Sequence, residues 1–157
     1  MEQIAAIIER ASDGTYSVYC KHEIFSGMGS PLKEAKADME GQMAVYRETA
    51  IEQGFKYPSF LDGEYEVAYE VDAVSLLNYY IGSGLFTLTA LEKLTGINQK
   101  QLWAYTSGTR PRKAQADRIN AGFRRLSEDL AAIFACLFGS FTQASSGSPP
   151  GLPFFVT

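Results

Sequence analysis

One segment, residues 64–72, alternates strictly between two kinds of side chain, and this pattern constrains the fold of the chain more than any other. A period of two residues is that of a β-strand with one buried face. We therefore expect a strand with an apolar side and an acidic side. The apolar side consists of Tyr65, Val67, Tyr69 and Val71. The acidic side carries Glu64, Glu66, Glu70 and Asp72, with Ala68 among them.

The residues before this segment predict three short strands and one long helix. Strands are expected over residues 4–8 and 16–22, joined by a hairpin turn at residues 12–14. A third strand is expected to end near Phe25, before a turn at residues 27–29. The helix should begin with Ser30 as its cap and Pro31 in its first turn, and run to about Gln53. Its core-facing stripe is predicted to be Leu32, Ala35, Met39, Met43, Tyr46 and Ala50.

The order β-β-β-α-β predicts a small α+β domain over residues 1–71. From Asp72 onward the apolar spacing becomes helical, which predicts an all-α domain over residues 72–138. Residues 139–157 are rich in Gly, Ser and Pro and are expected to form a flexible tail.

The charge is distributed unevenly along the chain. Residues 1–80 hold six Lys/Arg and fourteen Asp/Glu, whereas all eight basic residues of the second half lie between Lys93 and Arg125, with Asp117 as the single acid among them. Local basic density of this kind favours a phosphate-facing surface, although the whole chain has a net charge of −4.

A pair of short helices is expected inside the basic segment. Leu88, Leu91 and Leu94 form the apolar side of the first helix, Gly96 permits a tight turn, and Asn98 caps the second helix. The second helix then exposes residues suited to contact with DNA bases and phosphates. With the loop that follows, the predicted DNA-binding residues are Asn98, Gln99, Lys100, Trp103, Thr109, Arg110, Arg112 and Lys113.

The last helix carries a heptad-like seam, formed by Ile119, Phe123, Leu126, Leu130, Ile133 and Leu137. Its first half should pack on the helix pair. Its second half extends further than a small domain requires, so we expect Leu130, Ile133 and Leu137 to form a contact between two copies of the chain, in preference to packing within one copy.

A catalytic function is disfavoured by the placement of the reactive residues. The carboxylates lie on the polar side of one strand, while residues 4–8, the neighbouring strand, contain none, so a nuclease-type metal site is not expected. Cys20 and His22 share a strand face but no third group orients them, so a catalytic dyad is not expected either. We expect no enzyme activity, no metal and no cofactor.

A cytoplasmic protein is expected from three features. No stretch reaches the roughly 18 to 20 apolar residues of a membrane span, and an acidic residue stands near the N-terminus where a secretory signal carries basic ones. Cys20 and Cys136 are far apart, fit no metal-ligand spacing, and are expected to be buried reduced thiols.

Residues 88–126 resemble the Cro/repressor-type helix-turn-helix. Together with the segments from Ile7 to Tyr19 and from Gly27 to Ala35, the arrangement over residues 1–130 resembles the HicB-family antitoxins of type II toxin–antitoxin systems. The resemblance implies a partial RNase-H-like N-terminal domain without catalysis. It also implies that this domain sequesters a small basic HicA-type ribonuclease toxin and that the second domain represses the operon by binding its promoter. Glu92 departs from the motif, because most Cro-type sequences place a small residue there.

The acidic side of the 64–72 strand suits a basic, RNA-cleaving partner, so Glu64, Glu66, Glu70 and Asp72 are the expected toxin-binding residues. An alternative function is a helix-turn-helix transcriptional regulator whose N-terminal domain senses a ligand or mediates assembly. In both cases the expected assembly is a homodimer or a larger homo-oligomer.

Overall fold

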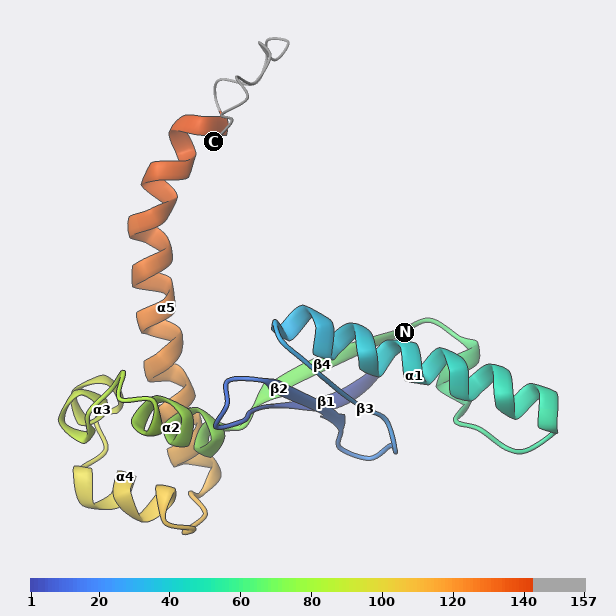
Figure 1. Ribbon diagram of the computed structural model, residues 1–157, viewed down its shortest axis with the longest axis horizontal. Helices are drawn as coiled ribbons and strands as arrows, with labels where there is room; N and C mark the ends of the chain where they lie inside the picture. Colours follow the sequence, from blue (N-terminus) through green and yellow to red (C-terminus); the bar gives the residue numbers. More distant parts are fainter. Residues whose placement is uncertain (143–157) are drawn as a thin grey trace, which may run out of the picture.

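The computed structural model describes the backbone from Met1 to Thr142 and the side chains as far as Ala135. Figure 1 shows a strand-rich half and a helical half, from which the last helix projects. The first half contains β1 (Glu2–Arg10), β2 (Tyr16–Cys20), β3 (Ser26–Gly29), α1 (Leu32–Gln53), the 3-10 turn η1 (Ser59–Asp62) and β4 (Tyr65–Val71). The second half contains α2 (Ala73–Gly82), α3 (Leu88–Thr95), α4 (Gln99–Thr106) and α5 (Lys113–Thr142). The predicted α+β class and the β-β-β-α-β order are confirmed.

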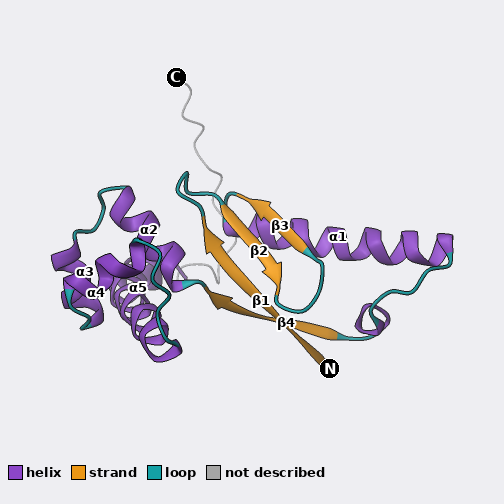
Figure 2. Ribbon diagram, turned by 90° about the horizontal axis from the view of Figure 1, so that it is seen from below, coloured by secondary structure: helices purple, strands orange, loops and turns teal. Residues whose placement is uncertain are grey.

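The four strands form one mixed sheet in the order β3-β2-β1-β4. β1 pairs antiparallel with β2, as the predicted hairpin requires, and parallel with β4, so that Ile8 lies beside Val71. α1 covers one face of the sheet, and the opposite face, which is turned toward the viewer in Figure 2, has no helix over it. β4 is therefore an edge strand with one open face.

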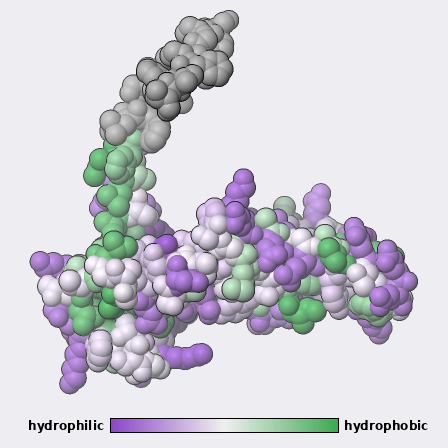
Figure 3. All heavy atoms as spheres, in the orientation of Figure 1, coloured by the Kyte–Doolittle hydropathy of each residue, from purple (hydrophilic) through white to green (hydrophobic). Residues whose placement is uncertain are grey.

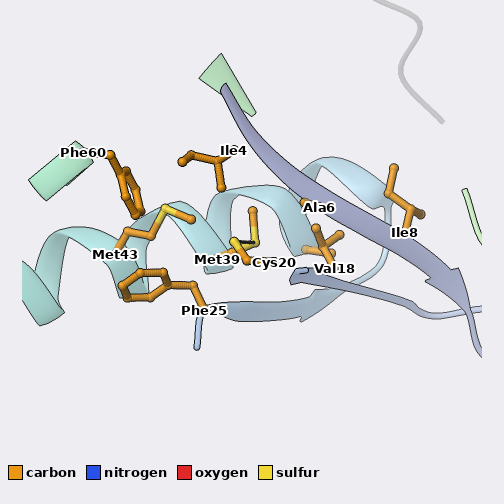
Figure 4. Close-up of a cluster of buried hydrophobic side chains, with 10 residues drawn as sticks. Ile4, Ala6, Ile8, Val18, Cys20, Phe25, Met39, Met43 and Phe60 are labelled. Atoms are coloured by element: carbon orange, nitrogen blue, oxygen red, sulfur yellow. Dashed lines mark hydrogen bonds between the residues drawn. The ribbon is translucent and has the colours of Figure 1, made fainter. Parts of the chain in front are cut away.

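The first core fills the space between the sheet and α1. β1 contributes Ile4, Ala6 and Ile8 on alternate positions, and α1 contributes Met39 and Met43 among others (Figure 4). The stripe predicted for α1 is confirmed, because Ala35, Met39, Met43 and Ala50 are buried and the remaining two positions are half-buried.

The third strand was predicted wrongly. β3 occupies the glycine-rich stretch Ser26–Gly29 that was expected to be a turn, whereas Phe25 is a buried core residue before it. The physical reason is a close approach between β3 and α1. A Cβ atom on Gly27 would lie 2.3 Å from the carbonyl oxygen of Ala35 and 2.4 Å from the amide nitrogen of Met39. The glycines are needed for backbone contact, and not for a turn.

The predicted start of α1 was also wrong by one position. Pro31 itself is the N-cap residue, with extended backbone angles, and no side chain caps the helix. Ser30 therefore does not cap α1. Gly54 ends the helix in the left-handed conformation, with φ of 74°, at the place expected from the sequence.

The second core lies among α2, α3, α4 and α5. Leu77, Leu91, Leu102 and Ile119 are fully buried and come from the four helices in turn. Phe123 of α5 packs against this cluster, which confirms that the first half of the α5 seam covers the helix pair. Every buried member of this cluster follows Asp72, and every buried member of the first cluster precedes it.

The two halves are joined without a linker. The side chain of Asp72 accepts a hydrogen bond of 2.9 Å from the amide of Ser75 and so caps α2 directly after β4. Arg10, at the end of β1, lies over the ring of Tyr79 at 3.8 Å and donates to the hydroxyl of Tyr80 at 3.1 Å. Since both tyrosines belong to α2, Arg10 fixes this helix against the sheet.

α5 continues to Thr142, three residues beyond the Gly139 at which a flexible tail was expected to begin. The helix thus includes residues 139–142, and the remainder of the expected tail, residues 143–157, lies outside the described residues. Among the helices that are described, none has the length and apolar character needed to cross a membrane.

Candidate nucleic-acid and protein interfaces

α3 and α4 are joined by a three-residue turn. Gly96 ends α3 with φ of 71°, in the left-handed region that the sequence predicted for it. The hydroxyl of Thr95 donates to the carbonyl of Leu91 and accepts from the amide of Ile97 at 3.2 Å, which holds the turn from inside. The side chain of Asn98 then accepts a 2.8 Å hydrogen bond from the amide of Gln101. Asn98 is confirmed as the cap of α4, and its side-chain oxygen is engaged in that role.

The two sides of α4 differ sharply. Leu102 and Tyr105 are buried against the second core, as is Ile97 just before the helix. On the other side, Gln99 and Lys100 are exposed, and the indole of Trp103 is 59% exposed. These three side chains and the free amide groups at the start of α4 form one surface of amide, ammonium and aromatic groups. Each of these groups has a known complement on DNA.

Glu92 of α3 lies beside this surface. Its Oε2 atom accepts a 2.9 Å hydrogen bond from Nε2 of Gln99. Glu92 thus places a carboxylate beside α4, hydrogen-bonded to a predicted base-contacting residue. Sequence reasoning noted the unusual residue but did not foresee this hydrogen bond.

The loop between α4 and α5, together with the first residue of α5, presents three cationic side chains. The amide of Thr109 donates to the carbonyl of Ala104 at 3.0 Å, which folds the loop back against α4. Arg110 and Arg112 are exposed, as is Lys113, whose Nζ atom lies 2.9 Å from Oδ2 of Asp117. An exposed ion pair of this kind contributes little to stability, so Lys113 is available to a phosphate at small cost.

Two arginines of the basic segment have a structural role that the sequence did not reveal. Arg118 donates to the carbonyl oxygen of Gly96 at 2.9 Å, and Arg125 donates to that of Leu94 at 2.8 Å. Both acceptors lie at the C-terminal end of α3, where carbonyl groups lack helical partners and the helix dipole favours cations. Part of the local positive charge therefore holds α3 to α5.

The acidic residues predicted for β4 do not all behave alike. Glu64 and Glu66 are exposed and free of ion pairs among the described residues, whereas Glu70 forms a 2.6 Å ion pair with Lys21. Asp72 is half-buried and caps α2, so its carboxylate is already used. Glu66 and Glu70 project from the open face of the sheet, Glu66 without an ion pair among the described residues and Glu70 beside Lys21.

The middle of the open face contains a residue pair that the sequence did not suggest. The hydroxyl of Tyr19 donates to Oε1 of Glu9 at 2.9 Å. Burial of the phenol, together with this hydrogen bond and the charge of Glu9, raises the pKa of Tyr19 to about 12. The positive charge of Arg110 acts in the opposite direction on the pKa of the same phenol.

The candidates for nucleophilic chemistry are separated. Cys20 is buried, and its sulfur lies 3.8 Å from that of Met39, while His22 is exposed beyond the end of β2. Burial raises the pKa of the Cys20 thiol, which disfavours the reactive thiolate. The part of the chain that the structure describes holds no group of three or more His, Cys, Asp or Glu side chains arranged to bind a metal ion.

The far half of α5 exposes an apolar face. Leu130, Ile133 and Phe134 have exposed fractions of 46%, 62% and 53%. In Figure 3 this stretch of helix is coloured as hydrophobic and stands clear of the molecule. Leu137, the third residue predicted for a dimer contact, belongs to the helix, but its side chain lies outside the described residues.

Comparisons of the chain with protein-family models, with curated proteins and with solved structures give no match. The function is therefore inferred from the residues and their arrangement.

Proposed function

We propose that this chain is an antitoxin that also represses transcription of its own operon, with α3 and α4 acting as a DNA-binding helix-turn-helix. The observation that carries the DNA-binding half is the exposed side of α4. Gln99, Lys100 and Trp103 project from a helix whose opposite side is buried, so the helix can enter the major groove without loss of packing. Glutamine suits adenine, and lysine suits guanine or phosphate.

The loop after α4 supports the same orientation on DNA. Arg110, Arg112 and Lys113 are exposed and follow α4 directly, which is where a helix-turn-helix approaches the backbone that flanks the groove. These cations provide affinity without sequence preference, whereas α4 provides discrimination. The two roles predict different responses to salt.

Dimerisation of the chain is consistent with this proposal. Dimeric helix-turn-helix proteins bind two half-sites related by a twofold axis. The apolar face of α5 at Leu130 and Ile133 is exposed among the described residues and continues a heptad seam whose first half is already packed. We propose that α5 pairs with α5 of a second copy and so sets the spacing between two α4 helices.

The antitoxin half of the proposal comes from the resemblance to HicB-family antitoxins and from the charge of the sheet. Glu66 and Glu70 project from an open face that no described helix covers. A ribonuclease must be basic where it holds RNA, so opposed charge would speed encounter and help to block the RNA site. In this proposal the sheet binds a small basic HicA-type toxin and performs no catalysis, and its finer fold corresponds to a partial RNase-H-like domain.

The DNA-binding half is tested by selecting a site from a random duplex library and measuring affinity for that site and for random duplex. Replacing Gln99 or Lys100 with Ala should weaken the selected site by about 1–3 kcal/mol and random duplex much less. Lys56→Ala, an exposed lysine in the loop after α1, serves as the control. Equal losses on both duplexes would show that this side of α4 does not read sequence.

The antitoxin half is tested by co-expression with a short basic protein, if the adjacent reading frame encodes one. The double variant Glu66→Lys, Glu70→Lys should restore toxicity, while the same reversal at Glu48 and Glu52 on the exposed side of α1 should not. Normal neutralisation by the first variant would exclude this acidic face as the contact. A neighbouring frame without such a protein would favour the alternative, a regulator with a sensing or assembly domain.

A further inference from the structure

Along the outer edge of β4, from Tyr65 to Tyr69, the backbone groups form no hydrogen bond with any described residue. In the parallel pairing with β1, the amide of Asp72 donates to the carbonyl of Ile8, so even-numbered residues of β4 bond inward. The odd-numbered residues Tyr65, Val67 and Tyr69 then direct their amide and carbonyl groups outward. No described element pairs with them, because β4 ends the sheet. Figure 2 shows β4 along the free border of the sheet.

The two edge strands of the sheet differ in length and in how far their outward backbone groups are bonded. At the opposite edge, β3 has only four residues, and the amide of Met28 donates to Oδ2 of Asp38 at 2.9 Å. β4 has seven residues, and among the described residues only Asn120 contacts an outward group, donating to the carbonyl of Val71 at 2.9 Å. Long open edges invite strand pairing, and proteins usually cover or shorten them. β3 is blocked in this way and β4 is not.

Pairing of β4 with a second copy of itself is opposed by its charges. On the open face, the positions from residue 64 to 72 are occupied by Glu64, Glu66, Ala68, Glu70 and Asp72. An antiparallel pair centred on Ala68 would set Glu66 opposite Glu70 of the other copy. A pair centred on Glu66 would set Glu66 opposite Glu66 of the other copy. A pair centred on Val67 would set Glu64 directly opposite Glu70. Like charges at these distances are destabilising.

We infer that the free edge of β4 is a strand-addition site for an extended segment of a protein partner, with lysine or arginine at alternate positions. The segment would add a fifth strand beside β4 and bond to the outward groups of Tyr65, Val67 and Tyr69. Its cations would face Glu66 and Glu70, and its other side chains would lie on the α1 side of the sheet, beside Tyr65 and Tyr69. This inference rests on the proposed function, because it specifies how the basic toxin engages the acidic strand.

The probe is a nine-residue peptide in which lysine and valine alternate, and the control peptide has the same composition in two blocks. Hydrogen exchange of the full chain is followed with each peptide. We expect the alternating peptide to slow exchange of the outward amides of Tyr65, Val67 and Tyr69 and to leave that of Ala68, which already bonds to β1, unchanged. Equal effects of both peptides, or slowing without this alternation, would overturn strand addition.

Charge variants give the second measurement. Glu66→Gln with Glu70→Gln should weaken the alternating peptide by roughly tenfold, as expected for two cross-strand charge pairs. Glu48→Gln with Glu52→Gln on α1 should leave its affinity unchanged. Equal weakening by both double variants would overturn the inference, as would slowed exchange at β4 that depends on protein concentration without peptide. If the peptide binds as expected but the chain neutralises no toxin, the antitoxin proposal fails and the edge remains a strand-addition site.

Discussion

The side-chain amide of Gln99 is hydrogen-bonded to the carboxylate of Glu92 across the turn between α3 and α4, at 2.9 Å. Gln99 is a proposed base-contacting residue. Because of this hydrogen bond, its orientation in the free protein is set by a residue of the other helix. One amide hydrogen and the carbonyl oxygen of Gln99 remain available for a base. Glu92 also brings a negative charge toward the surface that would meet phosphates, which opposes binding to DNA of any sequence.

Replacing Glu92 separates these two effects. Glu92→Gln keeps an acceptor for Gln99 and removes the charge, so affinity should rise on selected and random duplexes alike. Glu92→Ala removes both, so discrimination between the two duplexes should fall by about fivefold, the equivalent of one hydrogen bond of about 1 kcal/mol. Fluorescence anisotropy with labelled duplexes measures both quantities. Equal discrimination by the two variants would show that Glu92 does not position Gln99.

The basic loop should determine how strongly binding depends on salt. If Arg110, Arg112 and Lys113 each contact a phosphate, replacing all three with Ala should flatten the slope of log K against log salt by roughly three units. Lys33→Ala with Lys56→Ala, at two exposed positions of the first half, should leave the slope unchanged. A triple variant with the wild-type slope would remove the loop from the DNA interface.

The elements that could be predicted from the sequence are those whose signal is local. The strand at 65–71, the stripe of α1, and the capped helices on either side of Gly96 all follow from side-chain period and capping residues within each segment. β3 was missed because its glycines respond to α1, a segment that follows them in the chain, and not to their own neighbours. A glycine needed for close backbone approach and a glycine needed for a turn have the same sequence signature.

In the candidate sites, too, local features could be predicted from the sequence and tertiary contacts could not. Exposure of Gln99, Lys100 and Trp103 could be predicted from the spacing of Ile97 and Leu102. The engagement of Arg118 with Gly96, and of Glu9 with Tyr19, depends on tertiary contacts between different elements. Charge density along the sequence therefore overstated the number of cations free for DNA, because two arginines hold helix carbonyls.

Two glycine substitutions test the backbone contact between β3 and α1. Gly27→Ala would place a methyl group within 2.4 Å of two backbone atoms of α1, so the sheet and helix must separate. We expect a loss of about 1–3 kcal/mol in the free energy of unfolding, as for other overpacked cores. Gly41→Ala, in the exposed middle of α1 with open space around it, should stabilise by about 0.5–1 kcal/mol. Urea unfolding of both variants provides the measurement, and a neutral Gly27→Ala would contradict the close contact.

Tyr19 should make the stability of the protein depend on pH in the alkaline range. Its pKa is raised to about 12, because burial and the carboxylate of Glu9 disfavour the phenolate. In the unfolded chain the same phenol ionises near pH 10. Between these values the folded state holds one more proton, so the contribution of Tyr19 to stability is complete below about pH 10 and is lost as the pH rises toward 12.

Ultraviolet titration of the phenol groups detects this residue directly. Tyr19→Phe should remove one late-titrating step, and its stability should fall less steeply than that of the wild type over the same pH range. Glu9→Gln should move the step to lower pH, since the hydrogen bond then goes to a neutral acceptor. If Tyr19→Phe leaves the titration curve unchanged, the phenol is not held in the environment described.

The exposed face of α5 should pair two copies of the chain. Leu130→Glu with Ile133→Glu places two carboxylates in the centre of the proposed seam, where they would have to be buried without partners. We expect this variant to be monomeric in light scattering and to bind a single half-site, with weaker affinity for the full selected duplex. Ala135→Glu introduces the same side chain at an exposed position outside the seam and should leave the dimer intact. A double variant that still elutes at twice the mass of the chain would place the contact on another surface, such as the sheet. Circular dichroism separates these results from unfolding, because the second core ends at Phe123 and does not depend on Leu130 or Ile133.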